Sequence, residues 1–171
     1  MRENCQQLPS PNFRKSTNKR KVKLIVIHAT RTTKSASPLH WLTLKSSQKS
    51  AHYLIDLDGT VYQLVDENNI AWHAGNSRWK GMEEINPRTQ NPSVNSCSIG
   101  IELVNANDGI MPYPEPQVES LRALVGAICR ERGISSENIV RHLDVSPGRK
   151  TDPANFPFDD FKGRLYKDGI S

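Results

Sequence analysis

Three residues of this 171-residue chain have side chains that can bind a metal ion and stand where short structural segments end. His28 closes an apolar run, His142 closes a second short run, and Asp152 follows ten residues later in a proline-containing loop. Zinc hydrolases commonly bind the metal through three nitrogen or oxygen ligands and leave a fourth position for water. A single histidine at a strand end is more often structural, so the spacing permits metal-assisted hydrolysis without requiring it.

Cysteine chemistry is not indicated. Cys5, Cys97 and Cys129 are an odd number, lie far apart and form no CxxC pair, which argues against a disulfide framework or a cysteine metal site. Cys129 falls in the apolar pattern of a helix and Cys97 at the beginning of a strand. Both are therefore predicted to be small buried apolar residues.

Length and composition predict one globular domain. A chain of 171 residues with 36% hydrophobic and 24% charged residues can bury one ordinary core. It contains no apolar run long enough to cross a bilayer and no apolar stretch like the core of a secretory signal near its start. These observations predict no membrane span and no export by the signal-peptide route, and leave the location open.

The charge balance favours an anionic partner. The formal net charge is +5, and much of the excess lies near the start of the chain, in Arg14, Lys15, Lys19, Arg20, Lys21 and Lys23. A solvated leader is an equally good interpretation of this run. Because no recognition helix, RNA-binding aromatic motif or cysteine finger accompanies it, nucleic acid is not the expected partner.

The elements that must position these residues alternate between strand and helix. Strands are expected at 22–28, 98–104 and 139–142, and a hairpin at 51–65 turning at Asp58-Gly59. Helices are expected at 38–44 and 117–132, the second ended by Gly133. Residues 1–20 read as an extended polar and basic arm before a domain at 21–171, and residues 74–97 as a long surface loop. The alternation predicts an α/β fold.

The strand expected at 98–104 brings an acid to one face of the sheet. Ser98, Gly100 and Glu102 alternate with apolar residues, so that Glu102 emerges beside small neighbours. Taken alone, Glu102 would be an exposed or salt-bridged strand carboxylate.

Five separated motifs give the chain a family resemblance. They are VIHAT, SAHYLIDLDGTVYQLV, AWHAG, SIGIELVN and RHLDVSPGRKTDP. Together they resemble the type 2 N-acetylmuramoyl-L-alanine amidases, most closely the AmpD-like branch, over about residues 21–161. The superfamily also includes phage amidase lysozymes and peptidoglycan recognition proteins. The resemblance implies a single α/β domain with a central mixed β-sheet flanked by helices and a zinc site in a groove at one sheet end.

The resemblance also implies roles for the candidate residues. It places one Zn²⁺ per chain on His28, His142 and Asp152. Glu102 matches the acid that takes a proton from water and later delivers it to the leaving amine. Lys150 matches the lysine that stabilises the tetrahedral oxyanion.

Substrate contacts are implied less specifically. His73 resembles a groove position that contacts sugar or peptide, with Trp72 as apolar support or as ordinary core. Arg149 is a candidate for a substrate carboxylate or a surface residue. Some relatives carry a tyrosine before the histidine of the hairpin strand, where this chain has Ala51 before His52. His52 is therefore expected to be structural or to lie behind the ligands, and Glu102 to carry more of the proton transfer.

The function implied is hydrolysis of the amide between the muramic acid lactyl group and L-alanine, in peptidoglycan or in soluble muropeptides. A phage endolysin is the favoured setting because the chain is basic, and a cytoplasmic enzyme recycling anhydromuropeptides is the alternative. A non-catalytic peptidoglycan-binding module on the same fold and a nucleic-acid binder are the other candidates. A monomer without a membrane span is expected.

Overall fold

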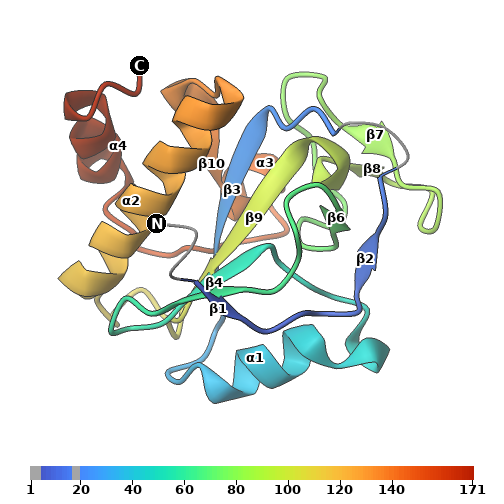
Figure 1. Ribbon diagram of the computed structural model, residues 1–171, viewed down its shortest axis with the longest axis horizontal. Helices are drawn as coiled ribbons and strands as arrows, with labels where there is room; N and C mark the ends of the chain where they lie inside the picture. Colours follow the sequence, from blue (N-terminus) through green and yellow to red (C-terminus); the bar gives the residue numbers. More distant parts are fainter. Residues whose placement is uncertain (1–4, 17–19) are drawn as a thin grey trace.

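The computed structural model describes residues 5–16 and 20–171, and a six-stranded mixed sheet forms its centre (Figure 1). The strands run in the order β1-β5-β4-β9-β3-β10. Their bounds are β1 Gln6–Gln7, β3 Leu24–Ala29, β4 Tyr53–Ile55, β5 Val61–Gln63, β9 Ser98–Leu103 and β10 Ile139–Arg141. β4, β9, β3 and β10 are parallel to one another, and β5 returns antiparallel to β4 through the predicted hairpin.

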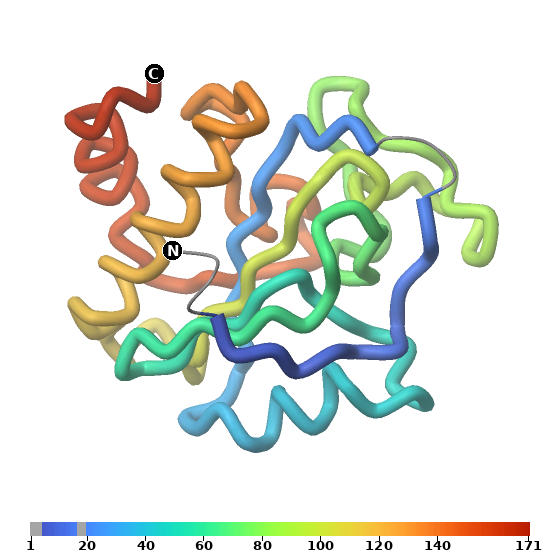
Figure 2. Tube along the Cα trace, in the orientation of Figure 1, coloured from blue at the N-terminus to red at the C-terminus, as the bar shows by residue number. Residues whose placement is uncertain are grey.

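One face of the sheet is covered by two helices, α2 (Glu115–Arg132) and α4 (Phe158–Lys167). Figure 2 shows both helices on the same side of the central strands. The main core lies between these helices and the sheet. Its strand residues are the odd-numbered Ile25, Ile27, Tyr53, Ile55, Ile99, Ile101 and Leu103. Because side chains alternate along a strand, the even-numbered residues of the same strands face the other way. Gly133 ends α2 with φ of +67°, as predicted.

The opposite face is covered only in part. Helix α1 (Ala36–Thr43) packs Leu42 against Leu54 and Val104 near the hairpin. At the start of β3, Leu24 and Val26 pack under the segment that connects the hairpin to β9. The part of this sheet face that lies between these two apolar clusters carries His28 and Glu102.

The segment 74–97 is more structured than the predicted surface loop. It contains a small sheet of β7 (Glu84–Ile85) and β8 (Pro92–Ser93) and a 3₁₀ turn, η3 (Asn95–Cys97). Ala74, Val94 and Asn95 are buried in it. Strands of two residues carry no readable alternation, which explains why the sequence pattern did not predict them.

The C-terminal half differs from the prediction at two points. β10 ends at Arg141, and His142 begins a one-turn helix, α3 (His142–Val145), instead of closing the strand. The Asp144 carboxylate accepts a hydrogen bond from the Arg141 N–H at 2.8 Å, which caps this turn. Helix α4, with Phe161 and Leu165 buried, was not predicted.

The described part of the first twenty residues pairs with the rest of the domain, although most of its side chains are exposed. β1 extends the sheet along β5, and β2 (Phe13–Arg14) pairs with β6 (Ile70–Ala71). Arg20 is 6% exposed and donates hydrogen bonds to the carbonyls of Glu67 and Asn95, so it departs from the solvated interpretation of the basic run. Lys19 lies outside the described residues, and the division of the chain at residue 20 stays a prediction.

Among the described residues, no helix has the length and apolar content needed to cross a bilayer.

Candidate metal centre and active site

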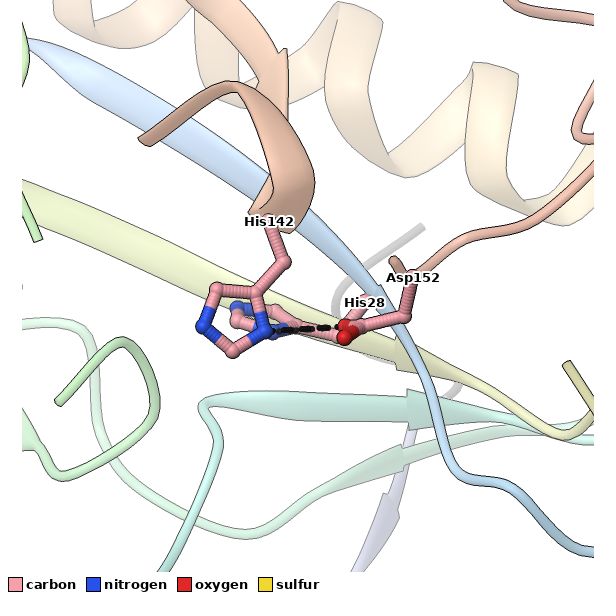
Figure 3. A group of neighbouring side chains, drawn as sticks. All are labelled: His28, His142 and Asp152. Atoms are coloured by element: carbon pink, nitrogen blue, oxygen red, sulfur yellow. Dashed lines mark hydrogen bonds and ion pairs between the residues drawn. The ribbon is translucent and has the colours of Figure 1, made fainter. Parts of the chain in front are cut away.

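His28, His142 and Asp152 come together in one buried group, although they are far apart in the sequence (Figure 3). The Nδ1 atoms of the two histidines lie 2.9 Å apart. The Asp152 Oδ2 atom lies 2.9 Å from Nδ1 of His142 and 3.6 Å from Nδ1 of His28. All three predicted ligands therefore point their donor atoms at one position.

The sheet register explains this convergence. β3 and β10 are parallel neighbours in which Arg141 pairs with Ile27, so His142 and His28 follow at the same edge of the sheet. The Leu143 N–H donates a hydrogen bond to the Asp152 carbonyl at 3.0 Å and returns the following loop to that edge. The third ligand is thus placed by α3 and the loop after it.

The three residues fit a tetrahedral metal ion. Zinc bonds of about 2.0–2.1 Å separate tetrahedral donor atoms by about 3.3 Å, close to the separations of 2.9 to 3.6 Å seen here. Nε2 of His142 lies 3.3 Å from the Ala74 carbonyl, which can only accept, so this nitrogen carries the proton and Nδ1 keeps its lone pair.

Electrostatics favour the forms of His28 and Asp152 that can bind a metal. Burial and the neighbouring His142 lower the pKa of His28 to about 4, so its ring is neutral at pH 7. Burial alone would raise the pKa of Asp152, but contacts with His142 and His28 outweigh it and hold that pKa below its usual range. A neutral imidazole and an ionised carboxylate are the forms that bind metal.

Glu102 lies beside His28, a predicted metal ligand, on the same face of the sheet. In the register of β3 with β9 it pairs with His28. Its Oε2 atom is buried and has no hydrogen-bond partner among the described residues. Burial, and secondly the charge of Asp152, raise the pKa of Glu102 to about 8, while Lys150 opposes the shift. A buried carboxylate oxygen without a protein partner is suited to contact water or substrate.

Lys150 supplies a cation to the same cavity. It is half-buried, and this burial lowers the pKa of Lys150 while Asp152 opposes the shift. Lys150, Glu102, His142 and Asp152 all line one cavity of about 730 Å³. The predicted acid, the predicted cation and two of the three predicted metal ligands therefore line the same cavity.

The cavity has a basic lining and an aromatic wall. Among the described residues that line it, the basic ones are Arg14, Arg31, Lys49, Arg88, Arg149 and Lys150, and the acidic ones are Glu84, Glu102 and Asp152. Trp72 also lines it, and the Arg88 guanidinium lies 5.0 Å from the Trp72 ring centroid. A ligand with carboxylates and apolar surface matches this lining.

The structure places His73 next to His28, a predicted metal ligand. His73 lines the cavity, as expected of a groove residue, but its Nδ1 lies 2.9 Å from Nε2 of His28. Its Nε2 lies 3.1 Å from the Ser98 hydroxyl oxygen. Burial, and secondly the neighbouring His28, lower the pKa of His73 well below its usual value. Sequence reasoning missed this contact, for which the chain offers no spacing signal.

Arg149 is held by the protein itself. Its guanidinium donates hydrogen bonds to the Ala74 carbonyl at 3.1 Å and the Ser146 hydroxyl at 2.8 Å, and also to the Asn76 carbonyl. These contacts tie the loop after α3 to the segment that begins at residue 74. His52 is also held within the protein, where its Nδ1 accepts a hydrogen bond from the Gly100 N–H at 3.0 Å.

The fold and the site define an α/β protein with a buried two-histidine, one-aspartate candidate metal centre beside a glutamate and a lysine. The sequence pattern of the N-acetylmuramoyl-L-alanine amidase family matches residues 18–155. The chain is 32% identical over 170 residues to the 1,6-anhydro-N-acetylmuramyl-L-alanine amidase AmpD of Haemophilus influenzae, covering 89% of this chain and 86% of AmpD. This chain belongs to the N-acetylmuramoyl-L-alanine amidase family.

Other relatives agree in sequence and in structure. The N-acetylmuramoyl-L-alanine amidase AmiD of Escherichia coli is 34% identical over 165 residues, which cover 88% of this chain. This chain spans about half (54%) of the length of AmiD. A crystal structure of AmpD superimposes with a TM-score of 0.76 at 26% identity, over 94% of this chain and 93% of that one. A mutant endolysin from Bacillus subtilis superimposes with a TM-score of 0.68 at 27% identity, over 95% of this chain and 98% of that one.

Proposed function

We propose that this chain is a zinc-dependent N-acetylmuramoyl-L-alanine amidase, which hydrolyses the amide between the lactyl group of N-acetylmuramic acid and L-alanine. The observation that carries the proposal is the presence of Glu102 and Lys150 in the cavity that also receives His142 and Asp152. Family membership supports the same bond. A binding module on this fold would not need a buried carboxylate without a protein partner.

The residues of the site divide the reaction between them. Zinc held by His28, His142 and Asp152 would acidify a water and polarise the amide carbonyl. Glu102 accepts the proton of the attacking water and later donates it to the leaving amine. Lys150 places positive charge where the carbonyl oxygen becomes negative. The products are a free lactyl carboxylate and a peptide that begins with L-alanine.

The proposed substrate is peptidoglycan or a soluble muropeptide. AmiD was crystallised with anhydro-N-acetylmuramic acid-L-Ala-D-γ-Glu-L-Lys, and that structure superimposes on this chain with a TM-score of 0.73 at 33% identity, over 91% of this chain and 60% of that one. The basic lining of the cavity matches the carboxylates of such a peptide.

The test incubates the zinc-loaded protein with purified peptidoglycan and, in parallel, with a soluble anhydromuropeptide, with and without a chelator. Mass spectrometry identifies the fragments. We expect peptides with a free L-alanine amino terminus, lost on chelation and restored by zinc. The better substrate separates a wall-degrading endolysin from an enzyme of soluble fragments.

His142→Ala is the matched variant for this experiment, and exposed His40→Ala is its control. The first should abolish zinc-dependent release, and the second should leave it unchanged. Zinc binding without cleavage of either substrate would contradict the amidase and favour a peptidoglycan-recognition module.

A further inference from the structure

A chain of hydrogen bonds runs from the candidate metal centre to the start of β9, and its members are His28, His73, Ser98 and the Val94 carbonyl. The Ser98 hydroxyl oxygen lies 2.7 Å from the Val94 carbonyl oxygen and 3.1 Å from Nε2 of His73. Nδ1 of His73 lies 2.9 Å from Nε2 of His28. Each contact needs one hydrogen atom. The donor and acceptor of each bond follow in turn, beginning at the Val94 carbonyl.

The Val94 carbonyl fixes the first direction. A carbonyl oxygen can only accept, so the single hydrogen of the Ser98 hydroxyl points at Val94. The Ser98 oxygen must then accept from His73, which puts the His73 proton on Nε2. Neutral His73 therefore has a lone pair on Nδ1, and His28 must supply the hydrogen between the two rings from its own Nε2.

The consequence lies at the other nitrogen of His28. With its proton on Nε2, neutral His28 presents a lone pair at Nδ1, the atom that lies 2.9 Å from Nδ1 of His142. The Ala74 carbonyl fixes His142 in the same way. Two imidazole lone pairs and the Asp152 carboxylate then converge without a hydrogen between them, an arrangement that a bound cation stabilises.

The backbone of β9 is adapted to this arrangement at Gly100. A Cβ atom at residue 100 would lie 2.3 Å from Cγ and 2.5 Å from Nδ1 of His73. No side chain can therefore replace the glycine unless the His73 ring moves. The ring of His52 packs edge-on at 5.8 Å between centroids and supports it further.

We propose that His73 is a positioning residue for the metal centre, which holds His28 in the tautomer that binds zinc through Nδ1. This inference rests on the proposed zinc site and assigns His73 a role other than the substrate contact implied by resemblance. His73 acts on the metal through His28, so its removal should weaken zinc binding before it changes the chemistry.

The test measures the dissociation constant of zinc by competition with a chromophoric chelator. His73→Leu should bind zinc 10 to 100 times more weakly, the effect typical of losing a partner that orients a metal ligand. His73→Asn should recover most of the affinity, because its Oδ1 can accept the His28 hydrogen in place of Nδ1. His40→Leu makes the same change at an exposed histidine and should match the wild type.

Gly100→Ala tests the arrangement without altering the chemistry of His73, and its zinc affinity should fall in the same direction. Urea unfolding of the metal-free proteins separates this effect from loss of the fold. A variant of wild-type stability with weakened zinc binding supports the proposal. In ¹⁵N-labelled zinc-loaded protein, His28 should be metal-bound at Nδ1 and protonated at Nε2.

Equal zinc affinity of wild type and His73→Leu, or metal binding by His28 through Nε2, would overturn the proposal. If His73 contacted the substrate instead, KM would stay raised at saturating zinc while zinc affinity was unchanged. Failure of the proposed function has a different signature, since the wild type itself would then bind no zinc or release no L-alanyl peptide.

Discussion

Glu102 combines two properties that suit proton transfer, an oxygen without a protein partner and a pKa raised by burial. Glu102→Gln keeps the shape of the side chain and removes its ability to accept a proton. We expect kcat for release of L-alanyl peptides to fall by about 10²- to 10⁴-fold. Zinc content should be unchanged, because Glu102 is not among the proposed ligands. A loss of both zinc and activity would reassign Glu102 as a metal ligand.

Lys150 contributes charge, and its substitution tests that contribution directly. Lys150→Met retains much of the aliphatic chain and should lower kcat by about 10²- to 10³-fold, as removal of one oxyanion-stabilising group does. Exposed Lys167 on α4 provides the matched control, Lys167→Met, with unchanged turnover. A rise in KM alone would place Lys150 in substrate binding rather than in stabilisation of the transition state.

At the scale of single residues, the grouping of His28, His142 and Asp152 could be predicted because each lies inside a motif that carries the family resemblance. The contact between His73 and His28 could not be predicted. The two residues are 45 positions apart, and their approach depends on the absence of a side chain at Gly100. Sequence spacing carries no information on which nitrogen of an imidazole faces its neighbour.

At the scale of elements, the predictions were confirmed where apolar residues recur with a clear period. Strands β3 and β9, the hairpin and α2 all have such a period. Helix α4 was missed because it is short: Phe158, Phe161 and Leu165 recur at helical spacing, but over fewer than three turns, and the acids Asp159 and Asp160 follow its first residue. These acids suit the first turn of a helix, a signal that the apolar pattern does not include.

The hairpin turn is locked to α2 at Gly59. Its φ is +87°, and a Cβ there would lie 2.7 Å from the Pro116 carbonyl oxygen and 2.8 Å from the Ser120 hydroxyl. Gly59→Ala should therefore lower the free energy of unfolding by about 1–3 kcal/mol. A Cβ at Gly163 in α4 would meet no atom of another element within 4 Å, so Gly163→Ala should raise the free energy of unfolding by about 0.5–1 kcal/mol. Urea denaturation of both variants measures the contrast, and equal effects would contradict this account.

At the scale of the whole molecule, stability should depend on pH through buried histidines. Burial, and secondly the charge of Arg20, hold the pKa of His52 well below its usual value. The unfolded chain therefore binds a proton at pH values where the folded protein does not. Stability should fall as pH decreases below about 6.5, by about 1.4 kcal/mol per pH unit for each such histidine.

His52→Asn tests this dependence, because asparagine does not titrate. Between pH 7 and pH 5 the variant should lose less stability than the wild type, with a difference in slope of about one proton. All other ionisable side chains are the same in the two proteins, so the difference between the two slopes isolates His52. Parallel slopes would show that His52 is protonated in the folded state.

The two faces of strand β9 have different functions. Ile99, Ile101 and Leu103 are fully buried against the helices, whereas Ser98, Gly100 and Glu102 serve the candidate site on the other face. In evolution the first set is free to exchange one apolar shape for another, but the second is restricted by chemistry. Among relatives, the residue types along β9 should therefore vary at every second position. A relative that has lost catalysis should differ at the even-numbered positions and keep apolar residues at the odd-numbered ones.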